Sequence, residues 1–457
     1  MSDTSVQSPS CARTDWFRDF FLIFLVAAAL RLALFAAALP YPERFQEPDT
    51  ATYYLPAINL LHHFSFSKSP EAPFLPEEFR TPGYPAFAAL VFAVLPERHA
   101  SVVFVQCLLS AFACCLLYGV ARSWWGRKMG LLVGLAQALS MSGVVNSLYF
   151  LSDGLYSILV ILQIVLWARY LQTHALRWVC LASACLGLMT LTRPIGMMWI
   201  IPQIFLLLTE PGQPWKRRLI ATVVGLLIFQ ACIIPWKLHN AHVGIGYTLC
   251  TAAGSTLYLN NVVASEAART NTSGDILRAQ WGQELEQIFA RERQRFATPQ
   301  ARCDYQVQRS LEIMKAHPLA YAKAHLKPWA LLPNVNGVFQ LLGIAGGQRG
   351  TLDILTRQGV VAAANHYLDG RWWLLLLMLP WIALQGAAYA LATCGCVLLF
   401  KRRLWWEIMA FLAFSYYYIF MVGPVTLARY QEPAMPAIFL LAAWALLQLR
   451  QSYRNRS

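Results

Sequence analysis

The sequence has little charge for its length. Only 13% of its 457 residues are Asp, Glu, Lys or Arg, whereas 57% are hydrophobic. A soluble globular domain carries about 25% charged residues, so the composition excludes a wholly soluble protein. Acidic residues are scarcer than basic ones, with 23 Asp and Glu against 37 Lys and Arg, and the formal net charge is +14. Basic residues retained in cytoplasmic loops can account for this excess without a nucleic-acid partner.

Several common features are also missing. The chain has no Gly-rich phosphate loop, which argues against a nucleotide site on the inner face. It has no internal repeat of the kind that builds many transporters. Most of its 11 cysteines lie inside apolar runs, where they act as small hydrophobic residues. Only Cys250 and Cys303 share a long polar stretch, and there a disulfide and two free thiols are both open.

What the sequence does contain is apolar segments of membrane-spanning length. A spanning helix needs about 20 mostly apolar residues. Ten segments fit, at 20–39, 100–121, 129–148, 153–170, 178–192, 195–209, 219–236, 373–399, 404–421 and 433–449. The apolar stretch 82–95 is too short and suits an interfacial or re-entrant segment. The sequence therefore predicts an all-α polytopic membrane protein with ten to twelve transmembrane helices.

The basic residues predict its orientation. Lys and Arg remain in cytoplasmic loops, and a cytoplasmic N-terminus places every basic cluster on one side if 82–95 does not cross. The clusters lie at 13–18, 122–128, 169–177, 216–218, 401–403 and 450–456. Both termini are then cytoplasmic. The outward regions are the first loop, 40–99, the turn at 423–432, and residues 237–372, which we expect to form a small external layer with interfacial helices.

This orientation divides the chain into three parts. An N-terminal transmembrane module covers residues 1–236 and includes the first external loop. The external region 237–372 follows, and transmembrane helices complete the chain over 373–457.

Ionisable groups gather at the predicted outer face. Glu47 and Asp49 begin the first loop, Arg80 stands in "FRTPGYP", Asp153 in "LSDGLY" and Arg193 in "LTRPIG". Charged groups at a membrane bundle are costly and are candidates for function. These residues, distant in sequence, are expected at one depth in the membrane.

Each of these residues also has a structural interpretation. Asp49 could cap the following helix, or accept a proton from an acceptor hydroxyl, and the two can hold together. Arg80 could reach for lipid headgroups, or bind phosphate oxygens with its planar fork of donors. Asp153 could cap its helix, and Arg193 could simply precede a proline turn. Arg31, near the middle of the first span, needs a buried carboxylate such as Asp153 or a ligand headgroup.

In the order of its motifs, the chain resembles the bacterial membrane glycosyltransferases of the C-type superfamily. The closest branch is the one related to protein O-mannosyltransferases and the lipid A aminoarabinose transferase. The motifs are an aspartate in the first loop, "YYLPAINLL", "RTPGYPAFAAL", "LSDGLY", "LTRPIG", "IIPWKLHN", "KAHPLAYAKAH" and "ARYQEPAMP". The resemblance implies an enzyme that transfers a sugar, with inversion, from a polyprenyl (undecaprenyl) phosphate donor. The acceptor would be an envelope glycan, lipid A or a protein, at the periplasmic face of a bacterial inner membrane.

The resemblance also implies roles for individual residues. Asp49 would be the catalytic base, and the donor phosphate would be bound by Arg80, Arg193 and Arg429. Substrate contacts are expected from Glu47, Tyr53, Tyr84, Asp153 and Tyr430. The sequence points to no particular cofactor. A divalent metal near His62 and His63 is an alternative to a purely interfacial pair of histidines.

Two other functions fit the same charges. A transporter or flippase for a lipid-linked sugar would also need basic and acidic groups facing a cavity, and a non-catalytic subunit of an envelope-glycan complex could carry an inert acidic loop. Broken repeats near the midplane are typical of transporters. Charges gathered at one face, without repeats, favour the enzyme.

Overall fold

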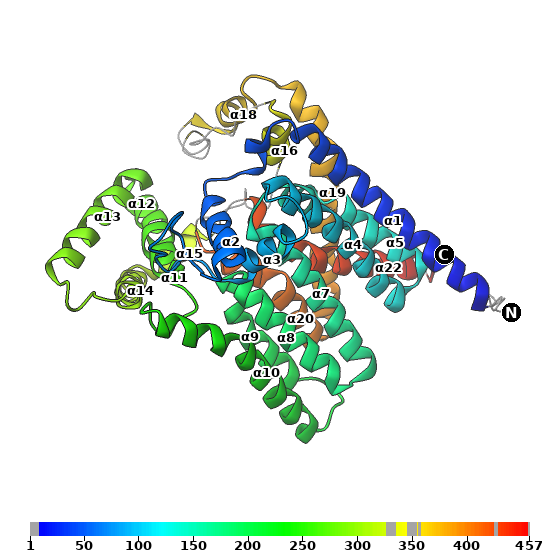
Figure 1. Ribbon diagram of the computed structural model, residues 1–457. Helices are drawn as coiled ribbons and strands as arrows, with labels where there is room; N and C mark the ends of the chain where they lie inside the picture. Colours follow the sequence, from blue (N-terminus) through cyan, green and yellow to red (C-terminus); the bar gives the residue numbers. More distant parts are fainter. Residues whose placement is uncertain (1–8, 326–334, 345–353, 355–357, 425–427, 456–457) are drawn as a thin grey trace.

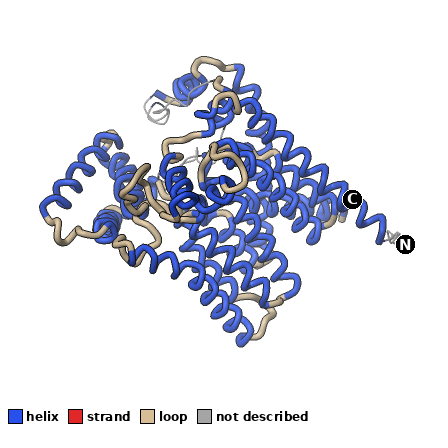
Figure 2. Tube along the Cα trace, in the orientation of Figure 1, coloured by secondary structure: helices blue, strands red, loops and turns tan. Residues whose placement is uncertain are grey.

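The computed structural model is helical in the part of the chain that it describes, residues 9–325, 335–344, 354, 358–424 and 428–455. These residues form no β-strand, and their only strand-like pairing is an isolated bridge between Ser67 and Pro76 (Figure 2). Helices satisfy their backbone hydrogen bonds internally, which is what a lipid environment requires of long apolar segments. The predicted all-α class is confirmed.

Six helical segments in the described ranges are long and apolar enough to cross a membrane. They are α1 (Pro9–Ala38), α4 (His99–Trp125), α7 (Ser152–Thr173), α10 (Trp215–His242), α19 (Trp373–Lys401), and η5 (Ala428–Ala434) together with α22 (Met435–Arg454). The protein is therefore a multi-pass membrane protein.

The prediction of ten spans is not confirmed, because four of the expected segments are short or interrupted. They contain α5 (Arg127–Ala138) with α6 (Met141–Asn146), α8 (Leu176–Thr192), η2 (Pro194–Trp199) with α9 (Ile200–Leu208), and α20 (Trp405–Phe414) with α21 (Tyr416–Phe420). Ser140 interrupts the first of these segments, because its hydroxyl accepts the Gly143 amide and caps the start of α6. Ser415 divides another with a non-helical backbone at φ −126° and ψ −70°.

The segment expected not to cross forms α3 (Gly83–Phe92). Its 10 residues span about 15 Å at 1.5 Å per residue. The hydrocarbon core of a bilayer is about 30 Å thick. Helix α3 is therefore too short to cross by itself.

The long helices pack side by side in one bundle. Helix α1 lies on α4 and α5, α7 lies between α4 and α8, α8 packs on α10, and α22 contacts α19 and α5 (Figure 1). Every residue from Met435 to Ala443 is buried, so the N-terminal half of α22 lies inside the bundle. The segment just before it, η5, is consequently held in a fixed position.

The elements predicted to lie outside the membrane are found at the opposite end of the molecule from both termini (Figure 1). The first loop forms η1 (Pro42–Phe45) and α2 (Ala51–His63). The later part is α11 (Ala252–Ser255), η3 (Thr256–Val262), α12 (Val263–Thr270), α13 (Gly274–Arg291), α14 (Pro299–Ala316), α15 (Pro318–Ala324), α16 (Val335–Leu342) and α18 (Val360–Leu368). Cys250 and Cys303 are both buried there as free thiols.

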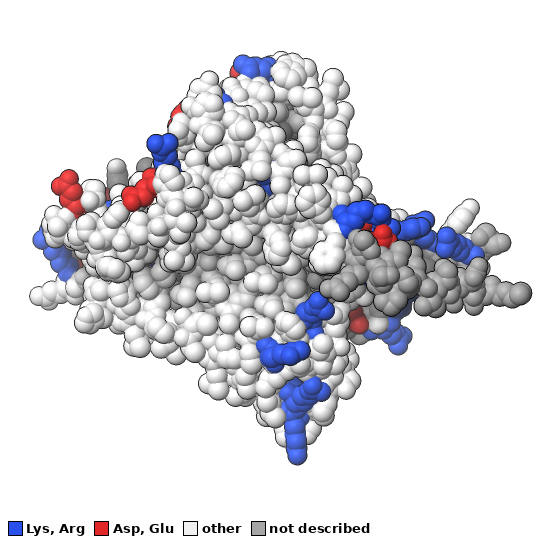
Figure 3. All heavy atoms as spheres, turned by 45° about the vertical axis from the view of Figure 1, so that its right-hand side comes forward, with Lys and Arg blue, Asp and Glu red and all other residues white. Residues whose placement is uncertain are grey.

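Basic side chains gather at the other end. In Figure 3, Lys and Arg cluster at the right and along the lower edge, toward the end where the termini lie in Figure 1. Part of this cluster is tied to α1, since Asp19 is 1% exposed and pairs with Arg127 at 2.7 Å and with Arg122 at 3.3 Å.

Candidate active site

The first external loop is tied to the segment that precedes α7. Thr50 stands at the N-terminus of α2, where its hydroxyl accepts the Glu47 amide at 2.9 Å and donates to the Phe150 carbonyl at 3.3 Å. No side chain caps α2 at this position. The Asp49 carboxylate is directed elsewhere, to two arginines.

Arg80 is the nearer of the two. Its Nη2 lies 2.9 Å from Asp49 Oδ1, its Nε donates to Thr52 Oγ1 at 2.8 Å, and its Nη1 donates to the Tyr53 hydroxyl at 3.1 Å. The guanidinium also lies over the Tyr53 ring, 4.4 Å from the centroid. The side chain is only 14% exposed, so it is held in the site and does not extend to lipid headgroups.

Glu77 fixes the turn that carries Arg80. Its Oε1 accepts the backbone amides of Phe79 at 2.6 Å and Arg80 at 3.1 Å. Burial raises the pKa of the Glu77 carboxyl. No sequence argument selected this residue. The signal in the sequence was its position: Glu77 comes two residues before Phe79 and three before Arg80, and short-range bonds of this kind from an acidic side chain to the backbone are common in turns.

A second ion pair lies beside the first. Asp153, in the first turn of α7, pairs with Arg193, which stands between α8 and η2. Their side chains are 9% and 25% exposed. The Tyr53 hydroxyl is 3.0 Å from Ser152 Oγ, and so connects this pair to Arg80.

Arg429 completes the cluster from η5. Its Nη2 lies 3.7 Å from Asp49 Oδ2, and its Nη1 lies 3.9 Å from Glu47 Oε2. Asn146 donates to the Arg429 carbonyl at 2.9 Å. The Nε of Arg429 is buried and has no hydrogen-bond partner among the described residues. Arg429 is therefore held through its backbone carbonyl, while its two Nη groups face the acids of the first loop.

The predicted tyrosines occupy different positions. Tyr430 contacts both cations, with Arg193 5.4 Å and Arg429 5.2 Å from its ring centroid. Tyr53 faces the cluster with its hydroxyl, and its burial raises the pKa of that hydroxyl. Tyr84 is fully buried and packs edge-on against Tyr53, with the ring centroids 5.2 Å apart. It therefore supports Tyr53 from behind and does not line the open side of the site.

The histidines lie apart from the carboxylates of the site. His62 Nε2 is 2.8 Å from Glu97 Oε1, and the His63 ring packs on Phe74. Within the described ranges, no three His, Cys, Asp or Glu side chains are grouped so that they could hold a metal ion.

Arg31 does not pair with Asp153, which was one of the partners considered for it. It is fully buried in α1 and donates to the carbonyls of Ala27 at 3.0 Å and Ala138 at 3.1 Å and to Ser110 Oγ at 3.0 Å. Helix α1 packs on α4 and α5, whereas α7 packs on α4 and α8. Arg31 therefore reaches the Ala138 carbonyl at the end of α5 and not Asp153 on α7.

Glu432 is a buried acid that sequence reasoning missed. It is 1% exposed, and its oxygens accept from Gln137 Nε2 at 2.7 Å and Ser140 Oγ at 2.9 Å. These bonds anchor η5 to α5 three residues after Arg429. Its only sequence signal was an acid beside the "RY" pair.

The six charged side chains of the site balance. Three guanidiniums, of Arg80, Arg193 and Arg429, face three carboxylates, of Glu47, Asp49 and Asp153. Asp49 is the most exposed of the six, at 47%, against 9–25% for the others. The site therefore presents one accessible carboxylate next to largely enclosed cations.

Comparisons with known proteins were made for the whole chain. Residues 79–239 match the family model described as dolichyl-phosphate-mannose-protein mannosyltransferase. Among curated proteins, none is similar enough to count as a match.

The fold is that of a solved archaeal enzyme. The chain is similar to the oligosaccharyltransferase of Archaeoglobus fulgidus in its apo form, with TM-score 0.53 and 14% identity over 96% of this chain and 52% of that one. The same enzyme in complex with an inhibitory peptide and a dolichol-phosphate gives TM-score 0.51 and 13% identity over 96% and 52%. The chain thus spans about half the length of these relatives.

A third similar structure is ArnT from Cupriavidus metallidurans bound to undecaprenyl phosphate, with TM-score 0.40 and 14% identity over 92% of this chain and 77% of that one. The resemblance drawn from the order of the motifs is confirmed, and the chain has the fold of the C-type membrane glycosyltransferases.

Proposed function

We propose that this protein is a membrane glycosyltransferase that transfers a sugar from a polyprenyl phosphate to an acceptor hydroxyl of the cell envelope. The acceptor would be a glycan, lipid A or a protein side chain, reached from the periplasmic side of a bacterial inner membrane. Asp49 is the base, and Arg80, Arg193 and Arg429 stabilise the donor phosphate. The solved oligosaccharyltransferase, which has the same fold, has been captured with a dolichol-phosphate, and this supports a lipid-linked donor.

The observation that carries the proposal is the position of Asp49 between two arginines. Its two carboxylate oxygens face Arg80 at 2.9 Å and Arg429 at 3.7 Å, while the side chain itself is 47% exposed. A general base must lie within hydrogen-bond reach of the proton that it abstracts. An acceptor hydroxyl arriving at the exposed carboxylate would then lie next to the cations that bind the phosphate.

The proposed step is balanced in atoms and charge. The acceptor oxygen forms a bond to the anomeric carbon from the face opposite the phosphate, the carbon–phosphate-oxygen bond breaks, and the phosphate departs with the electron pair. The acceptor proton moves to Asp49. The phosphodiester becomes a monoester with one more negative charge while Asp49 loses its own, so the total charge of the site is unchanged.

The arginines supply the electrostatic part of catalysis. Preorganised donors in a partly enclosed site stabilise a departing anion without having to reorient. Arg80 is held by Thr52 and Tyr53, and Arg429 keeps a buried Nε without a partner among the described residues. Arg193 is neutralised by Asp153 and contributes less charge than the other two.

Replacing Asp49 by asparagine tests the base. Removing the carboxylate leaves the acceptor proton without an acceptor, and loss of a general base costs about 10²–10⁴-fold in rate. Envelope glycolipids and glycoproteins of a deletion strain are compared by mass spectrometry after complementation with the parent chain or Asp49→Asn. We expect one monosaccharide to be missing from the deletion strain and to be restored only by the parent.

The matched control is Asp275→Asn, which removes the same charge from a side chain that is 91% exposed on α13. It should restore the sugar fully. Full restoration by Asp49→Asn at equal membrane abundance would exclude Asp49 as the base, and an unchanged envelope in the deletion strain would count against the enzyme itself.

A further inference from the structure

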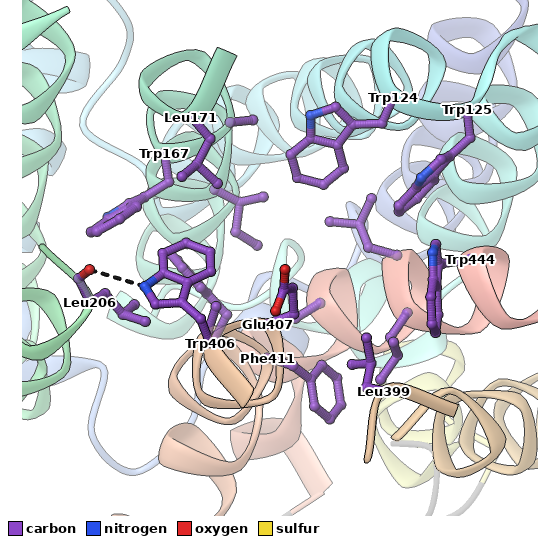
Figure 4. Close-up of a pocket in the computed structure, with 17 residues that line it drawn as sticks. Trp124, Trp125, Trp167, Leu171, Leu206, Leu399, Trp406, Glu407, Phe411 and Trp444 are labelled. Carbon is purple, nitrogen blue, oxygen red and sulfur yellow. Dashed lines mark hydrogen bonds between the residues drawn. The ribbon is translucent and has the colours of Figure 1, made fainter. Parts of the chain in front are cut away.

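A cavity of about 290 Å³ lies between α4, α7, α9, α19, α20 and α22 (Figure 4). Apart from Glu407, the residues that line it are apolar or aromatic. Five of them are tryptophans, Trp124, Trp125, Trp167, Trp406 and Trp444. The cavity is partly open, since Glu407 and Trp124 are exposed, and one carboxylate among five indoles is its distinguishing feature.

This cavity is separate from the candidate active site. Trp167 and Asp153 lie on the same helix, α7, and are 14 positions apart. At 1.5 Å per residue the two are separated by roughly 21 Å along the helix, and the hydrocarbon core is about 30 Å thick. The cavity therefore lies toward the other membrane interface, at the end where α19 closes with Lys401.

Glu407 is the one charged residue among those that line the cavity, and it is exposed. It stands in the first turn of α20, and Figure 4 shows its carboxylate pointing into the space between the rings of Trp124, Trp406 and Trp444. It makes no hydrogen bond or ion pair with any described residue. An acid at membrane depth normally has a cationic partner, and indole faces attract cations.

The basic residues beside the cavity do not supply that partner. Lys401, Arg402 and Arg403 come shortly before Glu407 in the sequence, yet the Arg402 guanidinium lies over the Trp444 ring, 5.7 Å from its centroid. The site thus presents an acid inside and basic side chains in the adjoining turn. This arrangement complements a zwitterion whose cation enters the cavity and whose anion stays at the rim.

The rest of the cavity wall favours an apolar ligand. Trp167 is 5% exposed, and its Nε1 is buried without a hydrogen-bond partner among the described residues. The Trp406 Nε1 is already used by the Leu206 carbonyl at 3.1 Å. The remaining wall, including Leu171, Leu399 and Phe411, is apolar and matches an acyl chain.

We propose that this tryptophan-lined cavity binds one aminophospholipid of the bilayer. Its ammonium lies between Glu407 and the indole faces, its phosphate lies toward Arg402, and one acyl chain follows the apolar wall. The cavity alone supports this inference, which does not depend on sugar transfer.

Native mass spectrometry of the delipidated full chain in detergent tests the lipid. Phosphatidylethanolamine and phosphatidylglycerol with identical acyl chains are offered in equal amounts, and N-acetylated phosphatidylethanolamine serves as a probe that keeps the phosphate but loses the cation. We expect the first bound lipid to be phosphatidylethanolamine, with a preference of about two- to fivefold over each competitor, the range of one exposed cation–π contact.

Glu407→Gln should reduce this preference by about half or more, because the amide retains the shape but not the charge while the indole faces remain, and Glu407→Asp should keep most of it. The control Glu286→Gln removes an exposed acid on α13 and should leave the preference unchanged. Equal binding of the three lipids by the parent, or the same preference in Glu407→Gln, would overturn the proposal and leave the tryptophans as ordinary interfacial residues.

Discussion

Asp153 and Arg193 form the most enclosed ion pair of the candidate active site. An ion pair of this kind contributes little net stability, but removing one partner leaves an uncompensated charge. The Arg193 side chain is 25% exposed, so water shields part of that cost. At the scale of single residues, the contribution of this pair to stability can therefore be measured separately from its contribution to activity.

Asp153→Asn should destabilise the protein by about 2–3 kcal/mol, below the roughly 3–5 kcal/mol of a fully buried pair. The double variant Asp153→Asn/Arg193→Gln should recover most of that loss, because no charge is left unpaired. Thermal unfolding in detergent measures both. A double variant as unstable as the single one would show that the stability comes from neighbouring contacts such as the Tyr430 ring.

Sequence reasoning at the residue scale succeeded unevenly. Arg80 and Asp49 were chosen as the centre of the site, and the structure brings them within 2.9 Å. Asp153 was the wrong partner for Arg31, which donates to two backbone carbonyls and to Ser110, and Glu77 and Glu432 were missed. A sequence shows that a buried charge needs partners, but the identity of the partner depends on which helix lies nearest.

At the scale of elements, the short helices determine how the site is assembled. Helix α3 follows the Arg80 turn directly, and it approaches α8 so closely that a Cβ on Gly83 would lie 2.6 Å from the Leu191 carbonyl oxygen. Backbone atoms cannot move aside as a flexible side chain does. Gly83 thus allows the Arg80 turn to rest on the end of α8, two residues before Arg193.

Gly83→Ala should separate α3 from α8 and destabilise the protein by about 1–3 kcal/mol, as overpacking does. Sugar transfer should fall at the same time, because Arg80 and Arg193 move apart. Unfolding temperature and transfer in membranes are the measurements.

Gly119→Ala is the control for this change, since a Cβ there meets no atom within 4 Å. It should leave both properties unchanged or stabilise the helix slightly. If Gly83→Ala behaved like Gly119→Ala, the close approach of α3 and α8 would not position the site.

The number of spans shows the limit of composition at this scale. The window that selected 129–148 and 404–421 measured apolar content, and both segments are indeed apolar. It could not detect that Ser140 and Ser415 interrupt their helices, because a serine within an apolar segment can equally bond back to its own helix. Helix α8, with 17 residues, is at the lower limit of a span.

At the scale of the whole molecule, the site and the basic cluster occupy opposite ends. The candidate active site lies at the N-terminal ends of α7 and α22, and the basic turns follow the C-terminal ends of α4 and α19. Retention of basic residues in the cytoplasm supports our proposal that the site faces outward. This orientation can be tested without knowledge of the substrate.

A cysteine introduced at Glu286 on α13 should react with a membrane-impermeant maleimide in intact spheroplasts. A cysteine introduced at Lys216, in the first turn of α10, should react only after permeabilisation. The parent chain is the control, and its background should be low because its described cysteines are buried or half-buried. Labelling of both positions from the same side would contradict the proposed orientation.

The sequence by itself determined that this protein spans a membrane, that it is helical, and at which end of the bundle the ionisable groups of the site gather. These follow from transfer free energies that depend on each segment's own composition. Tertiary structure alone decided which arginine meets which carboxylate, that Glu432 anchors η5, and that five tryptophans and Glu407 line one cavity. Such contacts join residues far apart in the chain, and their geometry depends on how the helices pack against one another, which no local pattern encodes.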